Sequence, residues 1–338
     1  MDKILNETQE IQIALHQLHQ LEQTTITLIR KSVNTTYRVE TKSQTYYLRL
    51  YADNAYFETT EGNICFELAL MQHLVKHGIA IPNPVLNVSG SLLSEIEMTN
   101  KCLKAALFQE VFGTPHKAWW PKIVGEKEIR KLGKLIARFH TVADIFTTQH
   151  SRYEFDLHFL LDKPLAVIQN SMNAIDYSGD LAFFEETSRY LRKTVEAIGK
   201  SPSAYGIIHG DTHVGNVLYE KITGFSLIDF DYCAYGWRIY DLVPLLNTLQ
   251  INVPDPAIVH RVWQLTLEGY EAIRPFSKRE KAALPAFQAL WHLWDLGETL
   301  TLSASGEEGR KPSAESVEKA IATLKKVKLD LEENHFCS

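Results

Sequence analysis

Cysteine is scarce in this chain of 338 residues, and its four copies lie far apart. They are Cys65, Cys102, Cys233 and Cys337, and no two of them form a CxxC pair. This usage argues against a disulfide framework and against a zinc–thiolate site, and it fits a protein of a reducing cytosol.

Long apolar runs are also missing. The first ten residues, MDKILNETQE, lack the apolar stretch of a secretory signal peptide. No apolar run approaches the about 20 residues that a membrane-spanning helix needs. We therefore expect a cytoplasmic protein without a membrane partner.

A concentrated positive charge is the third missing feature. The formal net charge is −6, and lysine and arginine are spread along the chain. Nucleic-acid binding needs a concentrated basic face to neutralise phosphates, so the sequence argues against a nucleic-acid partner. The apolar content of 45% and the charged content of 22% are ordinary for a globular protein. The length fits two domains, and the oligomeric state stays open.

The pattern of the first 111 residues predicts a mostly antiparallel sheet with one internal helix. Helical spacing over 8–22 is followed by the β-like runs TTITLI, TTYRVE and TYYLRLY. A helix is predicted over 59–77, with Thr59 or Thr60 as N-cap and Gly78 as its end. Two further strands are expected around 84–97 and another at 105–111.

After Gly113 the pattern becomes mainly helical. Residues 124–143 carry an apolar stripe, and only 205–230 looks like a β patch. An exposed loop is expected at 303–316, before a last helix. The sequence thus predicts an α+β protein with a small β-rich N-lobe (1–111) and a larger, mainly helical C-lobe (112–338).

The stretch GIIHGDTHVGNVLYE, residues 206–220, gathers His209, Asp211, His213 and Asn216. One hypothesis is a metal-hydrolase site, because the first three alternate and would share a face of a strand. Such sites need more ligands, and the remaining histidines form no cluster of recognisable spacing. A second hypothesis is a polar turn without chemistry, which would suit any one of these residues alone.

The downstream sequence favours a third hypothesis, phosphoryl transfer. In SLIDFDYCAYGWRIYDL, residues 226–242, Asp229 follows an apolar strand and comes 18 residues after Asp211. Phosphoryl transfer needs a carboxylate near the acceptor hydroxyl and hard oxygen ligands for magnesium. Kinase catalytic loops use the pattern H-x-D-x-x-x-x-N followed by a strand that ends in a metal-binding Asp. H-G-D-T-H-V-G-N followed by L-I-D-F-D has the same order.

Together, HGDTHVGNVL and LIDFD resemble the signature of the aminoglycoside phosphotransferase and choline kinase superfamily. YGWRIYDL and FQALWHLWDLG further resemble its homoserine-kinase-like and stress-response-kinase-like branch. The resemblance extends from about residue 8 to residue 302. It implies a bilobal, protein-kinase-like fold, with ATP as phosphoryl donor and Mg²⁺ as cofactor.

The resemblance also implies roles for the residues of these motifs. Asp211 would be the catalytic base beside the acceptor hydroxyl. Asn216 and Asp229 would hold Mg²⁺ on the ATP phosphates.

Four further residues would support this site. His209 and His213 would stabilise the loop through hydrogen bonds. Asp231 is either an additional metal contact or a solvated carboxylate of a turn. Asp241, in the family's "DL" motif, would cap a helix or brace the catalytic loop.

The N-lobe should supply a cation for the phosphates and a carboxylate that holds it. Arg49 stands where kinases usually have lysine, and Glu67 lies 18 residues later on the predicted helix. Without this context the two would be an ordinary surface pair that contributes little. Arginine keeps the charge but has a different geometry, so the change affects how the nucleotide is positioned.

Two further nucleotide contacts follow from the resemblance. The expected phosphate loop, IRKSVNTTYRV, contains no glycine, so Ser32, Asn34 and Thr35 would cover the phosphates with side-chain and backbone donors. The hinge would run through Gln109, Glu110 and Val111, with its backbone facing the adenine edge.

The acceptor site is expected to be built from helices of the C-lobe at about 140–200 and 255–300 and from the loop after Asp229, and these regions contain many aromatic and acidic residues. They are Tyr232, Tyr235, Trp237, Trp263, Tyr270, Trp291, Trp294, Glu268, Glu271, Asp295 and Glu298. Such a mixture suits a cationic acceptor, although Trp291 and Trp294 are also spaced like helix core. The predicted activity is ATP- and Mg²⁺-dependent transfer to a hydroxyl of a small molecule: an amino alcohol, hydroxy amino acid, sugar or aminoglycoside-like compound. A stress-response-type protein Ser/Thr kinase and a catalytically silent binding module are the alternatives.

Overall fold

The computed structural model describes residues 2–31, 33–52, 59–99, 101–115, 124–174 and 181–304, together with Glu318, Ala322 and Lys325. The chain divides into two compact units. The first comprises Met1–Phe112 and Phe146–Arg152, and the second comprises Gly113–Ile145 and Tyr153–Ser338. The sequence pattern gave no sign that 146–152 would join the first unit.

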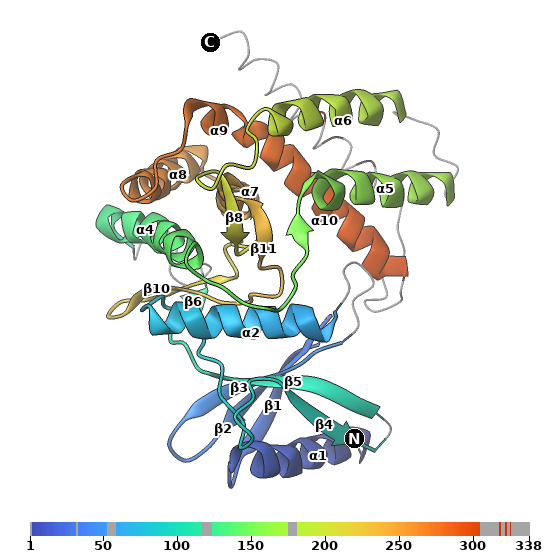
Figure 1. Cartoon of the computed structure of the whole chain (residues 1–338), viewed down its shortest axis with the longest axis vertical. Helices are drawn as coiled ribbons and strands as arrows, with labels where there is room; N and C mark the ends of the chain where they lie inside the picture. The colour runs from blue at the N-terminus through green and yellow to red at the C-terminus, as the bar shows by residue number, and fades with distance from the viewer. Residues whose placement is uncertain are drawn as a thin grey trace. The chain divides into compact units, whose positions relative to one another are not determined.

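The first unit contains a five-stranded antiparallel sheet in the order β1-β2-β3-β5-β4. Its strands are β1 (Thr25–Lys31), β2 (Thr35–Glu40), β3 (Thr45–Leu50), β4 (Ser94–Met98) and β5 (Lys101–Gln109). Helices α1 (Asp2–His19) and α2 (Glu61–Lys76) lie on opposite faces of this sheet (Figure 1). The predicted antiparallel sheet with an internal helix is therefore confirmed.

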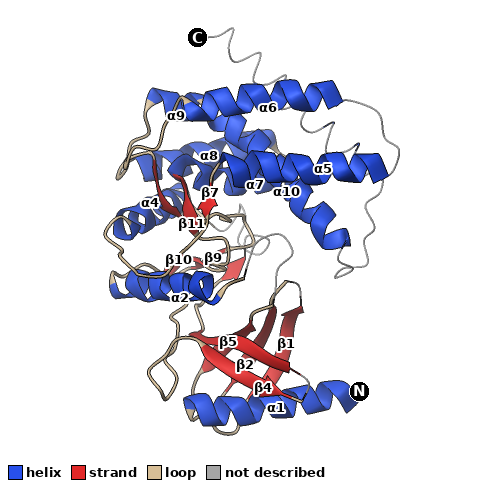
Figure 2. Cartoon of the chain, turned by 45° about the vertical axis from the view of Figure 1, so that its right-hand side comes forward, coloured by secondary structure: helices blue, strands red, loops and turns tan. Residues whose placement is uncertain are grey.

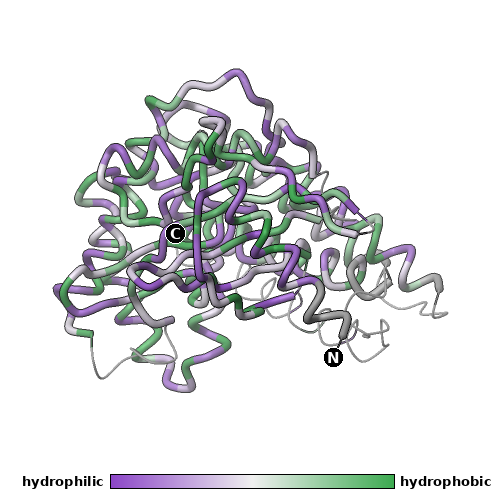
Figure 3. The backbone as a smooth tube through the Cα atoms, turned by 90° about the horizontal axis from the view of Figure 1, so that it is seen from below, coloured by the Kyte–Doolittle hydropathy of each residue, from purple (hydrophilic) through white to green (hydrophobic). Residues whose placement is uncertain are grey.

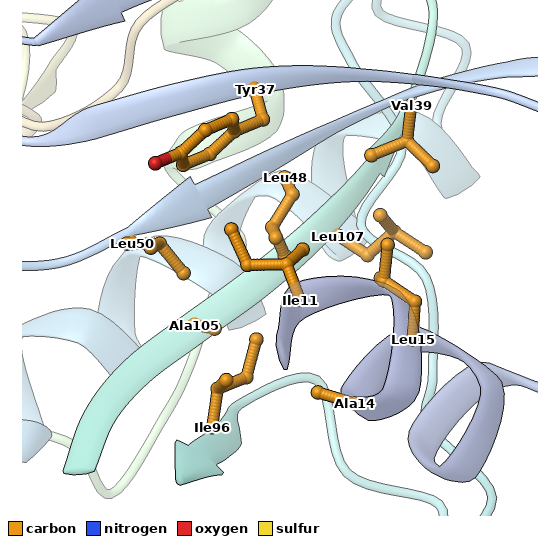
Figure 4. Packing of buried hydrophobic residues seen from close by; sticks show 10 residues of the cluster. All are labelled: Ile11, Ala14, Leu15, Tyr37, Val39, Leu48, Leu50, Ile96, Ala105 and Leu107. Atoms are coloured by element: carbon orange, nitrogen blue, oxygen red, sulfur yellow. The ribbon is translucent and has the colours of Figure 1, made fainter. Parts of the chain in front are cut away.

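One face of this sheet packs on α1 (Figure 4). Ile11 and Leu15 of α1 are fully buried against Val39, Leu48 and Leu107 of the strands. Side chains alternate along a strand, so the face that buries Leu48 turns Arg49 to the other side, toward α2. The apolar alternation of β3 thereby positions a candidate functional side chain.

The end signals of α2 act as the sequence predicts. The Thr60 side chain accepts a hydrogen bond from the backbone N–H of Asn63, which makes it the N-cap. After the helix, Gly78 has a φ of +73°, a left-handed conformation that glycine adopts without steric cost.

The prediction of two strands around 84–97 is wrong in its first half. Only β4 forms a strand, and the earlier segment contributes a single bridge between Pro84 and Phe108. Asn87 accepts hydrogen bonds from the backbone N–H groups of Ser89 and Ser91, and Gly90 has a φ of +81°. The asparagine side chain thus takes the backbone partners that a strand would need, and a turn results.

The second unit is mainly helical and carries two small sheets (Figure 2). Its helical elements are α4 (Glu126–Ala143), the π-helical turn η1 (His158–Asp162), α5 (Lys163–Ala174), α6 (Leu181–Glu196), the 3₁₀ helix η2 (Arg238–Leu242), α7 (Val243–Asn252), α8 (Pro256–Glu271), α9 (Lys278–Ala282) and α10 (Leu284–Ala304). One sheet has the order β10-β9-β6 and the other β7-β11-β8. The strands are β6 (Thr114–Pro115), β7 (Glu154–Phe155), β8 (Tyr205–Ile208), β9 (Val217–Glu220), β10 (Gly224–Leu227) and β11 (Ala234–Trp237).

Apolar and polar segments alternate along the backbone (Figure 3). Among the residues that the structure describes, no helix combines the length and the apolar character that crossing a membrane would require. Of the loop expected at 303–316, residues 303 and 304 belong instead to α10. The rest of that segment lies outside the described residues.

Helices α4 and α8 approach each other closely at two glycines. A Cβ atom at Gly133 would lie 1.9 Å from the backbone oxygen of Thr266, and one at Gly269 would lie 2.0 Å from that of Arg130. Each glycine thus lets the backbone of the other helix pass where any side chain would collide.

Replacing Gly133 by alanine is therefore expected to destabilise the protein by about 2 kcal/mol, because the new methyl group forces the helices apart. Urea unfolding monitored by circular dichroism measures the loss. Gly125→Ala is the matched control, since a Cβ atom at this N-cap of α4 meets nothing within 4 Å. Equal stability of the two variants would show that the helices adjust freely.

Candidate active site

The HGDTHVGN loop connects β8, which pairs with β11, to β9, which pairs with β10. In the β9–β10 ladder Val217 lies opposite Leu227, and in the β8–β11 ladder Ile208 lies opposite Ala234. The segment between β10 and β11 contains Asp229. The two ladders therefore fix both ends of the segment that contains Asp229 beside the two ends of the loop. The spacing along the chain alone does not guarantee this arrangement.

Asp211 lies in the middle of this loop. The amide nitrogen of Asn216 donates to its carboxylate oxygen Oδ2 at 3.0 Å and to its backbone oxygen at 2.9 Å. About 15% of its side chain is exposed. Burial raises the pKa of Asp211, and the nearby Asp229 charge raises it further, while His213, His209 and Asn216 act in the opposite direction. A carboxylate held in this way is a stronger base than a solvated one.

Asn216 is buried, and its backbone bonds both neighbouring segments. Its N–H donates to the oxygen of His213, and its own oxygen accepts from the N–H of Ile228. Because the amide nitrogen faces Asp211, the side chain offers its oxygen, Oδ1, as the atom for a cation. A hard oxygen donor of this kind fits Mg²⁺.

Asp229 has a φ of +66°, an uncommon conformation for a residue with a side chain. Such conformations cost free energy and occur preferentially at functional sites. Its negative charge acts on both Asp211 and His209. The site thus offers carboxylate and amide oxygens from two segments. This donor set suits Mg²⁺, because in proteins Mg²⁺ usually binds one or two carboxylates, substrate phosphates and several water molecules.

Both histidines of the loop hydrogen-bond to nearby backbone. His209 is buried, with Nε2 3.0 Å from the Ile228 oxygen, while its Nδ1 accepts from the Asp211 N–H. Burial lowers the pKa of His209, so it is neutral, with the proton on Nε2. The Nδ1 of His213 accepts from the Gly215 N–H, and its Nε2 lies 3.6 Å from Oδ2 of Asp211.

Asp241 braces the start of the loop. Its two carboxylate oxygens accept the backbone N–H groups of His209 and Gly210, each at 2.7 Å. Gly210 has a φ of +82°, and a Cβ atom there would lie 2.3 Å from the Tyr232 oxygen. Of the two roles expected for Asp241, the hydrogen bonds correspond to the loop brace.

The backbone oxygen of Asp231 accepts from the Tyr153 hydroxyl, and the role of its carboxylate stays a prediction.

The metal-hydrolase hypothesis finds no support here. Within the described ranges, no group of three or more His, Cys, Asp or Glu side chains could hold a metal ion.

In the first unit, the expected ion pair is formed. The Nη1 of Arg49 lies 3.2 Å from Oε1 of Glu67, whose side chain is 2% exposed. The guanidinium also lies over the Phe108 ring. Arginine and glutamate of β3 and α2 are thus placed as sequence spacing predicts, and their contact with a nucleotide stays a prediction.

Other residues that are predicted to bind the nucleotide make hydrogen bonds within the first unit. The N–H groups of Gln109 and Glu110 donate to the oxygens of Asn83 and Thr45. Other groups of this segment, such as its carbonyls or Val111, would have to face an adenine ring.

In the expected phosphate loop, the Oδ1 of Asn34 accepts the N–H of Ala52 at 3.1 Å. Ser32 lies outside the described residues.

Four of the residues expected at the acceptor site make contacts elsewhere in the second unit. Glu268 pairs with Arg130 and Glu271 pairs with Lys281. Tyr270 is buried and hydrogen-bonded to His140, and the Trp237 indole donates to the backbone oxygen of Gly199.

Three members of the acceptor set lie toward the catalytic loop. The Trp294 ring meets Tyr232 edge to face at 5.1 Å, and Tyr232 abuts Gly210. The next residue on α10, Asp295, reaches solvent, yet desolvation by the protein around its carboxylate raises its pKa to about 6, and the Asp211 charge adds to the rise.

Residues 25–276 match the model of the phosphotransferase enzyme family. The chain belongs to this family. It is accordingly a phosphotransferase of the kinase type, and the predicted family is confirmed.

Known proteins resemble this phosphotransferase over most of its length. The homoserine kinase of Xanthobacter autotrophicus is 28% identical over 254 residues, which cover 75% of this chain and 72% of the relative. The amicoumacin kinase hAmiN, solved with AMP-PNP, Ca²⁺ and Ami, has a TM-score of 0.72 at 19% identity, covering 99% and 96% of the two chains. A microcompartment-associated aminopropanol kinase has a TM-score of 0.68 at 21% identity, covering 95% of each. The kinase-like α+β fold is thereby confirmed.

His140 of α4 contacts Asp241 and belongs to none of the sequence motifs that predict the site. Its only sequence signal is a polar residue four positions after Ile136, on the buried stripe of the helix.

Proposed function

We propose that the protein transfers the γ-phosphoryl group of ATP, with Mg²⁺, to a hydroxyl of a small molecule that also carries an amine. The observation that carries this proposal is the largely buried Asp211 carboxylate, held by Asn216 beside Asp229. Kinase-type transfer needs this combination of a base and adjacent hard oxygen donors.

In the proposed reaction, Asp211 takes the proton of the acceptor hydroxyl as that oxygen bonds to the γ-phosphorus. The bond between this phosphorus and the β,γ-bridging oxygen breaks, and ADP leaves with the electron pair. Asp211 then releases the proton to water. The products are the phosphorylated acceptor and ADP.

The metal would be held by Oδ1 of Asn216 and the carboxylate of Asp229. When bound, Mg²⁺ neutralises negative charge on the phosphates. In the first unit, Arg49 is proposed to contact the phosphates, with Glu67 fixing its guanidinium. Asn34, Gln109, Glu110, Val111 and Ser32 stay proposed nucleotide contacts.

The amine is proposed to bind Asp295. This carboxylate is solvent-accessible, interacts electrostatically with Asp211 and follows Trp294, whose ring packs on Tyr232. A cation near the two carboxylates would offset their mutual repulsion. The names of the homoserine kinase relative and of the aminopropanol and amicoumacin kinase neighbours support the same acceptor class.

Replacing Asp295 by asparagine is expected to raise the KM for an amine-bearing acceptor about tenfold, because a charge-assisted contact worth roughly 1.5 kcal/mol is lost. In the unmodified protein, the same KM should rise as the pH falls through about 6, since the raised pKa leaves Asp295 neutral below that value. Steady-state kinetics from pH 5.5 to 8 measure both effects. Glu271→Gln, at the surface pair with Lys281, is the control.

The proposed function is tested by ADP release from a panel of matched acceptors. Ethanolamine, 1-amino-2-propanol and homoserine are each compared with the compound in which the amine is replaced by hydrogen or hydroxyl, and a serine-containing peptide is included. Preference for the amine, lost in Asp295→Asn, is the expected result. Turnover of the peptide alone would overturn the small-molecule acceptor and favour a protein kinase. The enzymatic proposal would be overturned if none of the acceptors in the panel supported ADP release and titration with ATP and Mg²⁺ gave no heat of binding.

A further inference from the structure

We propose that His140 is a positioning residue for the catalytic loop and that it acts together with Tyr270 through Asp241. Neither His140 nor Tyr270 belongs to the loop or to its sequence motif. The inference rests on the proposed role of Asp211, because it concerns how that carboxylate is held in place.

Asp241 is fully buried and accepts three hydrogen bonds. Two come from the backbone N–H groups of His209 and Gly210, and the third partner is Nε2 of His140 at 2.9 Å. The Thr212 hydroxyl donates to its backbone oxygen. A buried carboxylate needs such donors in place of water, and loss of one leaves charge without compensation. The position of the turn before Asp211 thus depends on a donor that α4 supplies.

The protonation state of His140 follows from its two partners. The ring is completely buried, and burial lowers its pKa to about 4, a fall to which the charges of Arg238 and Arg274 add and which Asp241 opposes. The ring is therefore neutral at physiological pH. A carboxylate can only accept, so Nε2 carries the proton, and Nδ1 accepts from the Tyr270 hydroxyl at 2.8 Å. Tyr270 thereby selects the tautomer that donates to Asp241.

Packing brings these three residues together from separate elements. Gly133 and Gly269 let α4 and α8 approach closely, which places His140 within hydrogen-bonding distance of Tyr270. The Tyr270 ring stacks on Phe276 at 4.5 Å with 5° between the ring planes. The chain of contacts from Tyr270 through His140 and Asp241 to Gly210 therefore runs from a rigid helix pair to the residue next to Asp211.

Two substitutions at His140 distinguish the loss of its hydrogen-bond donor from the change in side-chain volume. His140→Leu removes the donor, whereas the side-chain amide of His140→Gln can still donate to Asp241. We expect His140→Leu to lower kcat about 100-fold, because small displacements of a reacting group have effects of this size, with the KM for ATP changed less than twofold. His140→Gln should recover most of the lost rate. Hydrogen exchange of peptides containing residues 209–210 should become about tenfold faster in His140→Leu and stay near the original rate in His140→Gln.

Tyr270→Phe provides a second approach if His140→Leu does not fold, because it keeps the stacked ring and removes only the hydroxyl. We expect about a fivefold lower kcat and faster exchange at 209–210. Thr141→Val is the matched control: it removes a hydroxyl from the adjacent residue of α4, where that group donates to Ala137.

Unchanged exchange at 209–210 in Tyr270→Phe and in folded His140→Leu, and a loss of kcat in His140→Gln equal to that in His140→Leu, would overturn a positioning role. The exchange measurement needs no acceptor. Failure of this inference is thus distinguishable from failure of the proposed function.

Discussion

Asp211→Asn is expected to lower kcat about 1,000-fold and to leave the affinity for ATP with Mg²⁺ within about twofold. General-base catalysis contributes roughly 10²–10⁴ to such rates. Asparagine has the same shape and can still bond Asn216, whose amide nitrogen now lies 3.0 Å from Oδ2. The substitution therefore removes the proton acceptor with little change in the loop, and binding of the phosphoryl donor does not depend on it.

Single-turnover transfer and calorimetric titration with ATP and Mg²⁺ measure the two quantities. Asp162→Asn is the control, because it removes one carboxylate charge at an exposed pair with Arg192. Retention of full turnover by Asp211→Asn would contradict its assignment as the base.

The pH dependence of turnover in the unmodified protein gives a second check on Asp211. Burial raises the pKa of Asp211, so activity should fall, as the pH is lowered, at a higher pH than for an ordinary carboxylate.

Asp229→Asn is expected to weaken binding of ATP with Mg²⁺ about 100-fold, because the charge of the proposed metal ligand is lost. Substitutions of residues that only support a metal ligand already cost about 10–100-fold in metal affinity. Asparagine tolerates the left-handed conformation that Asp229 adopts at φ +66°, so the backbone of the segment should persist. Titration of each variant with ATP at fixed Mg²⁺ gives the affinity directly.

Asp231→Asn is the matched comparison, two residues away and with the same change of charge. If Asp231 is a solvated turn carboxylate, its variant should bind like the unmodified protein; an effect equal to that of Asp229→Asn would place a second metal contact there. Undiminished affinity in Asp229→Asn would remove Asp229 from the metal site. The opposite outcomes for Asp211 and Asp229, one on rate and one on binding, test the division of roles between them.

Local pattern predicted those parts of the site that depend on neighbours in the chain. The alternation of β3 set Arg49 on the face opposite Leu48, and the spacing to α2 matched it with Glu67. The HGDTHVGN loop lies between two strands, as its flanking apolar pairs indicate. The prediction failed at 84–93, where the Asn87 side chain competes for the backbone groups that apolar content assigned to a strand.

By itself, the sequence determined the family, the α+β class and the order of Asp211, Asn216 and Asp229, because periodicity and motif spacing are local properties of a chain. Only the tertiary structure decided which distant groups support them. His140 and Asp241 are 101 residues apart, and His140 and Tyr270 are 130 apart. The contact between His140 and Tyr270 depends on the close approach of α4 and α8 at Gly133 and Gly269, which spacing along the chain does not encode. Trp237 and Tyr270, which the sequence places at the acceptor site, are buried in the core, whereas the charge of Asp295 interacts with that of Asp211.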